Sequence, residues 1–160
     1  MQSLTVLQEL IERLPGRLQQ LPAEKVERKP APDAWSAKEE LGHLVDSASN
    51  NHQRIVRAQL EEHPAMPGYD GDAWVALHQY QQRDWPSLIE RWAVLNRQLL
   101  AAAEAVPDSA WSRTLTIADS KPLTLRFVFG DYIHHMLDHL RHMGVEVGDF
   151  AKQAEAAEQS

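Results

Sequence analysis

The sequence contains no cysteine, which excludes disulfide bonds, thiolate metal sites and a cysteine nucleophile. It has no apolar run that approaches the ~20 residues of a membrane-spanning helix. Its formal net charge is −7, so it lacks the positive charge that sequence-independent nucleic-acid binding needs. A glycine-rich phosphate loop and a serine nucleophile elbow are also absent. We therefore expect a soluble, cytoplasmic protein, with no role for nucleic acid or a membrane.

Four stretches of the chain carry apolar residues at helical spacing. A break in the third stretch is expected at Asp84-Trp85-Pro86, because the residue before a proline avoids the helical conformation. Ser36 and Glu39 form a capping-box pattern that marks the start of the second stretch. The pattern predicts an all-α four-helix bundle with long crossover connections and a short extended segment near 111–122. The helical stretches are residues 3–20, 36–62, 73–106 and 124–143.

The length of 160 residues is sufficient for one domain with its own core. No shift in composition marks an internal boundary, so residues 1–150 are expected to form that domain. The Ala/Glu/Gln-rich residues 151–160 are predicted to be a flexible tail.

Half of the eight histidines fall between Asp131 and Met143. On an α-helix, at about 100° per residue, His135, His139 and His142 share one face. Two imidazoles one turn apart can bind one cation. The alternative is that these histidines lie at the core boundary and bond to backbone or water. The zinc-protease pattern, with Glu after the first His, is absent.

Three segments resemble the DinB/YfiT-like family of metal-binding four-helix bundles: Trp35–Leu44, the aromatic loop Tyr69–Trp74, and His135–Met143. They occur in the family's order and span nearly the whole chain. The resemblance implies a divalent metal ion held by three histidines. Carried onto this sequence, the ligands are His43, His135 and His139.

Helical spacing by itself does not predict a ligand at position 43. His43 lies more than about 100° from the apolar stripe of its own helix. Its polar neighbours there include Ser47 and Asn50, so a solvated histidine is the simpler interpretation. The assignment of His43 therefore rests on the resemblance. Where the family often has Gln, this chain has His142. His142 could donate a hydrogen bond that orients a ligand, be an extra ligand, or be a surface residue.

Several polar residues are candidates to orient a ligand imidazole by a hydrogen bond, although each is also plausible as a solvated side chain. A set of three neutral imidazoles is compatible with Zn²⁺, Ni²⁺, Fe²⁺ or Mn²⁺ and leaves coordination positions open for water or substrate. The orienting candidates are Asp46, Asn50, Asp131, Asp138 and His142.

The resemblance implies a metal-dependent enzyme that acts on a small molecule. The family includes thiol-dependent transferases and isomerases, in which a low-molecular-weight thiol is activated at the metal. The carboxylates of such a thiol need a cationic partner, and Arg54, Arg57, Arg126 and Arg141 are available. The alternatives are a metal-dependent hydrolase and a non-catalytic metal-binding stress-response module. Related proteins also suggest a homodimer.

Overall fold

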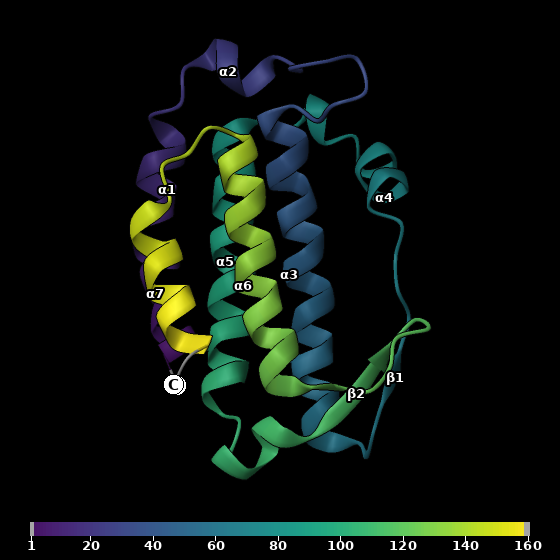
Figure 1. Cartoon of the computed structure of the whole chain (residues 1–160). Helices are drawn as coiled ribbons and strands as arrows, with labels where there is room; N and C mark the ends of the chain where they lie inside the picture. Colours follow the sequence, from purple (N-terminus) through teal and green to yellow (C-terminus); the bar gives the residue numbers. More distant parts are fainter. Residues whose placement is uncertain (1, 159–160) are drawn as a thin grey trace.

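The computed structural model describes residues 2–158, and four long helices in this range form a bundle (Figure 1). Helices α3 and α1 each pack against both α5 and α6, so α1 and α3 lie diagonally across the bundle. The predicted all-α four-helix bundle is confirmed. In the described range, no helix has the length and hydropathy that crossing a membrane requires. The long helices are α1 (Gln2–Gln19), α3 (Ala37–Leu60), α5 (Trp85–Glu104) and α6 (Leu125–His142).

The connections between these helices are long and carry short elements of their own, as predicted. Strand β1 pairs in parallel with β2, and β2 pairs antiparallel with β3, so the extended segment expected near 111–122 is present. Figure 1 shows this small sheet at one end of the bundle and α2 at the other. The short elements are α2 (Ala23–Glu27), β1 (Ala65–Met66), α4 (Gly71–His78), η1 (Tyr80–Gln82), η2 (Asp108–Ser112), β2 (Thr114–Ile117) and β3 (Leu123–Thr124).

Side-chain caps fix where the helices begin. The capping box predicted at Ser36 is present, with the Ser36 amide donating to Glu39 and the Glu39 amide to the Ser36 hydroxyl. Asp84 caps α5 at the predicted break, with proline in the first turn of the helix. Helix α1 continues through Pro15 to its end.

The structure corrects the prediction of a flexible tail at residues 151–160. Residues Gly148–Glu158 form helix α7, which packs against α1 and α6, and residues 159–160 lie outside the described range. Ala and Glu are strong helix formers, and the fully buried Phe150 anchors the start of this helix. Asp149 forms ion pairs with Arg13 and Arg17, which lower the pKa of its carboxyl to about 2.

The first half of α3 is buried on every side, because the segment that contains α4 and η1 covers its polar face. Tyr80 of η1 lies directly on Gly42. A Cβ atom at position 42 would come within 2.1 Å of the Tyr80 ring. Glycine at position 42 therefore allows this covering segment to pack closely against α3.

Replacing Gly42 by alanine should lower the free energy of unfolding by about 2–3 kcal/mol, because the buried Tyr80 ring has to move. Gly130→Ala in α6 is the matched control, since no heavy atom lies within 4 Å of a Cβ there. The control should be neutral or stabilising, because alanine favours a helix. Urea denaturation of both variants checks this, and equal stability would contradict the packing described.

Candidate metal centre

The structure brings His43, His135 and His139 together from two helices. His43 lies in the first half of α3, and the other two lie one turn apart near the end of the antiparallel α6. The Nε2 atom of His135 is 3.1 Å from that of His43 and 3.0 Å from that of His139. One ligand atom from each residue lies within 4.8 Å of the others, so the group could hold a metal ion.

His43 is buried, which corrects the expectation of a solvated position from helical spacing. Only 7% of the residue is exposed. The Trp35 ring lies 4.9 Å from its imidazole, and the Tyr69 ring lies 6.1 Å away. Gly71 approaches so closely that a Cβ there would lie 3.1 Å from the His43 ring. Distant parts of the chain thus cover a helix face that is polar in sequence.

Two of the three imidazoles are held in the neutral form. Burial, together with the nearby His139 and His135, lowers the pKa of His43 to about 3. Burial and His139 are the main causes that lower the pKa of His135 to about 4. Near neutral pH each of these rings therefore keeps one nitrogen lone pair free, and a metal ion binds this neutral form of imidazole.

Glu40 determines the tautomer of His139. Its carboxylate accepts a hydrogen bond from His139 Nδ1 at 2.5 Å, so the proton lies on Nδ1 and the lone pair lies on Nε2. That lone pair faces the other two Nε2 atoms. Glu40 is only 7% exposed, so its charge is poorly screened. A carboxylate in this position both orients a metal-binding imidazole and increases its basicity.

Sequence reasoning missed Glu40. The available signal was its spacing, since Glu40 precedes His43 by three residues and so lies on the same helix face. Nothing in the residue spacing connects Glu40 with His139, which is 99 positions away.

Three predicted orienting residues have other partners, and a fourth is exposed. Asp46 accepts from the Tyr80 hydroxyl at 2.6 Å and lies 3.1 Å from His78 Nδ1, while Asn50 donates to the backbone carbonyl of Asp46. Asp138 pairs with Arg141 at 2.5 Å and affects His135 only through its charge. Asp131 is exposed. Within the range of the chain that the structure covers, the carboxylate that accepts a hydrogen bond from a candidate ligand is that of Glu40.

His142 lies next to the centre without joining the three Nε2 atoms. Its Nδ1 is 3.5 Å from Glu40, its ring is 5.5 Å from that of His139, and its side chain is 62% exposed. Glu40, His139 and His142 form a second group that could hold a metal ion, and it shares His139 with the first. The two groups therefore compete for one imidazole.

The three-histidine group fits a cation well. Its Nε2 spacings suit nitrogen ligands bound at about 2.0–2.1 Å from one ion. His43 Nδ1 is buried and has no hydrogen-bond partner among the described residues, so no such bond specifies its tautomer. Only the tautomer protonated on Nδ1 has a free Nε2 lone pair for coordination, and the Nε2 atom of His43 faces that of His135.

The profile of the DinB superfamily matches residues 7–143. The chain belongs to the DinB superfamily. This confirms the family to which the motifs pointed.

Three bacterial relatives carry the name "Putative metal-dependent hydrolase". YfiT of Bacillus subtilis is 24% identical over 84% of this chain and 79% of its own length. A relative from Oceanobacillus iheyensis is 30% identical over 68% of this chain and 63% of its own. One from Halalkalibacterium halodurans is 25% identical over 88% and 80%. DinB-superfamily proteins similar to this chain are thus named for metal dependence.

Solved structures of low sequence identity share the fold. YfiT from Bacillus subtilis, described as having an unusual four-helix bundle topology, gives a TM-score of 0.71 at 22% identity, with 90% of this chain and 87% of that chain covered. A mycothiol-dependent maleylpyruvate isomerase gives 0.70 at 13% identity, with 95% of this chain covered. This DinB-superfamily chain spans only 64% of that isomerase.

Proposed function

We propose that this protein is a divalent-metal-dependent enzyme that acts on a small molecule, with the metal ion held by His43, His135 and His139. The observation that carries the proposal is the approach of three imidazole Nε2 atoms from α3 and α6. The names of the relatives support metal dependence. Three histidine ligands leave a position for water or substrate, which is typical of a catalytic site.

When bound, a divalent ion supplies a Lewis acid that lowers the pKa of water or of a thiol. The chain's own residues prepare the site for it. Glu40 holds His139 in the required tautomer, and the rings of Trp35 and Tyr69 shield His43 from water. These contacts keep the imidazoles in place before any ligand arrives.

The structure distinguishes Arg54 from the other arginines considered for binding a substrate anion. Its positive charge disfavours protonation of His135 and favours ionisation of Tyr69. Burial lowers the pKa of the Arg54 guanidinium, which stays a cation. Its Nη1 donates to the neutral Asn51 side chain at 3.2 Å. Arg57 and Arg141 are instead paired with Glu61 and Asp138.

A half-buried cation beside a cation-binding site is unfavourable unless an anion joins them. In the described part of the chain, Arg54 has no carboxylate within ion-pair distance, although Asp131 is near enough to act on its pKa. We infer that the substrate or cosubstrate carries an anionic group that binds Arg54 while its reactive atom lies at the histidines.

Two reaction classes fit such a site. A thiol-dependent transferase or isomerase is supported by the structural similarity to a mycothiol-dependent isomerase, and a low-molecular-weight thiol with carboxylates would suit Arg54. A hydrolase is supported by the names of the bacterial relatives. The non-catalytic stress-response module remains the alternative to both. The predicted homodimer stays a prediction that light scattering would test.

Turnover by metal-loaded protein separates these alternatives. One arm supplies glutathione, cysteine or mycothiol with 1-chloro-2,4-dinitrobenzene, where a sulfur–carbon bond forms and chloride and a proton leave. The other arm supplies 4-nitrophenyl acetate and 4-nitrophenyl hemisuccinate without thiol. Turnover only with thiol supports the transferase, and turnover without thiol supports the hydrolase. Bound metal without turnover in either arm would contradict the enzyme proposal.

Replacing Arg54 by glutamine should raise KM about tenfold for the anionic reactant and change kcat less, because a binding interaction is lost. Arg57→Gln on the same helix is the matched control and should leave KM within about twofold, since Arg57 is paired with Glu61 on the surface. Equal KM values in the two variants would contradict an anion site at Arg54.

A further inference from the structure

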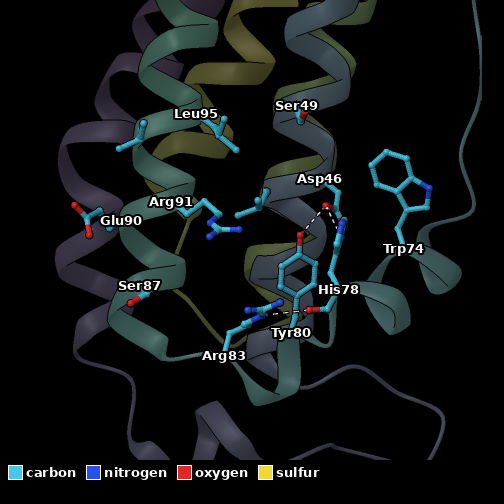
Figure 2. Close-up of a pocket in the computed structure, with 12 residues that line it drawn as sticks. Asp46, Ser49, Trp74, His78, Tyr80, Arg83, Ser87, Glu90, Arg91 and Leu95 are labelled. Atoms are coloured by element: carbon cyan, nitrogen blue, oxygen red, sulfur yellow. Dashed lines mark hydrogen bonds and ion pairs between the residues drawn. The ribbon is translucent and has the colours of Figure 1, made fainter.

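A cavity of about 700 Å³ lies between α3, the α4–η1 segment and α5 (Figure 2). None of the three candidate ligand histidines lines it. Trp74 lies in its wall and also packs against Tyr69, which contacts His43, so these two rings stand between the cavity and the metal centre. The volume is within the range of about 300–1,000 Å³ that is typical of small-molecule sites.

Two arginines make one side of this cavity positive. Figure 2 shows Arg91 extending from α5 toward Tyr80 and Arg83 below it. Glu90 also lines the cavity, with its carboxylate on the other side of α5 from Arg91. Burial and Asp46 raise the pKa of the Tyr80 hydroxyl, and both guanidinium charges oppose that rise. Arg83 donates to the backbone carbonyl of His78, and neither arginine forms an ion pair with a carboxylate anywhere in residues 2–158. Both arginines are exposed at the cavity, so their guanidinium groups are accessible to an anionic ligand.

The cavity also has an apolar part. Val94 is 47% exposed although it is apolar, and it lines the cavity with Leu95 and Val45. The indole of Trp74 forms part of the opposite wall. Exposed apolar side chains next to two arginines that have no carboxylate partner are typical of a site for a ligand with an anionic group and an apolar body.

The far wall is fixed before a ligand arrives. Asp46 and Tyr80 are 4% and 3% exposed, and the Tyr80 hydroxyl donates to Asp46 at 2.6 Å. His78 Nδ1 lies 3.1 Å from the same carboxylate, so His78 also contacts Asp46. A buried hydrogen-bonded network of this kind is rigid and reduces the ordering cost of binding.

We propose that this cavity is a second ligand site, separate from the metal centre, that binds a small organic carboxylate. Arg83 and Arg91 hold the carboxylate group, and Val94, Leu95 and Trp74 contact the apolar body. This site does not depend on the function proposed for the three histidines. It assigns a role to the Asp46–Tyr80–His78 network, which does not contact the candidate ligands.

The test is calorimetric titration of chelator-treated, metal-free protein with benzoate, phenylacetate and hexanoate, and with the neutral phenylacetamide as the uncharged counterpart of phenylacetate. At least one carboxylate should bind saturably, and phenylacetamide should bind at least about tenfold more weakly than phenylacetate. Arg91→Gln should weaken carboxylate binding about tenfold or more. Arg97→Gln, an exposed arginine of the same helix that does not line the cavity, should leave it within about twofold.

Two further variants locate the site. His135→Ala and Arg54→Gln should leave the affinity unchanged, because both residues lie outside the cavity. Loss of binding in either would assign the carboxylate to the metal centre and overturn the proposal. The absence of saturable binding by all three carboxylates, or equal affinity in the Arg91 and Arg97 variants, would overturn it as well. Circular dichroism of each variant verifies that the fold is retained.

Discussion

Replacing His43 by alanine should abolish stoichiometric metal binding, with an affinity at least about a hundredfold lower than in the unchanged protein. The reason is that only two imidazoles would then remain, both on one turn of α6. The fold should persist, because His43 Nδ1 has no hydrogen-bond partner to lose among the described residues. Isothermal titration of chelator-treated protein with Zn²⁺ measures the affinity, and circular dichroism verifies the fold.

The matched control is His52→Ala. His52 lies on the same helix α3 but belongs to neither group of possible ligands. Its removal should leave the affinity for Zn²⁺ within about twofold. If the His43 and His52 variants bound Zn²⁺ equally well, the metal centre would not include α3.

Replacing Glu40 by glutamine should lower the affinity for the metal about 10- to 100-fold, which is the range for partners that orient a ligand histidine. The glutamine keeps the shape of the side chain but removes its charge. Its amide can also donate to His139 Nδ1, which would move the proton to Nε2 and block the lone pair that faces the site.

Asp138→Asn is the informative control for Glu40. The sequence made Asp138 a candidate for orienting a ligand, whereas the structure pairs it with Arg141 on the surface, where its side chain is 62% exposed. Its replacement should change the affinity by less than about threefold, since exposed charges are well screened. A larger loss with Asp138→Asn than with Glu40→Gln would favour the sequence-based assignment over the structural one.

Helical periodicity was sufficient to predict the bundle, its helix starts and its long connections. The same periodicity was wrong about the surroundings of His43, because a helical wheel places each residue relative to its own helix alone. The face of His43 is polar in sequence and is buried by Trp35, Tyr69 and Tyr80, which approach it through long-range packing. The motif resemblance carried information about that tertiary arrangement that local spacing does not contain.

The C-terminal segment shows a related limit. Its Ala/Glu/Gln-rich composition indicated a flexible tail, but one buried ring at Phe150 and the ion pairs of Asp149 with Arg13 and Arg17 anchor it as a helix. The partners of Asp149 are more than a hundred positions away in the sequence. Glu40 was missed for the same reason, since its partner His139 is brought to it only by the packing of α3 against α6.

Anomalous diffraction from crystals of the zinc-loaded protein, recorded on both sides of the zinc absorption edge, tests the metal centre most directly. The structure predicts one strong peak among the Nε2 atoms of His43, His135 and His139, with Glu40 accepting a hydrogen bond from Nδ1 of His139. A peak among Glu40, His139 and His142 instead, or no peak near His43, would contradict the proposed site.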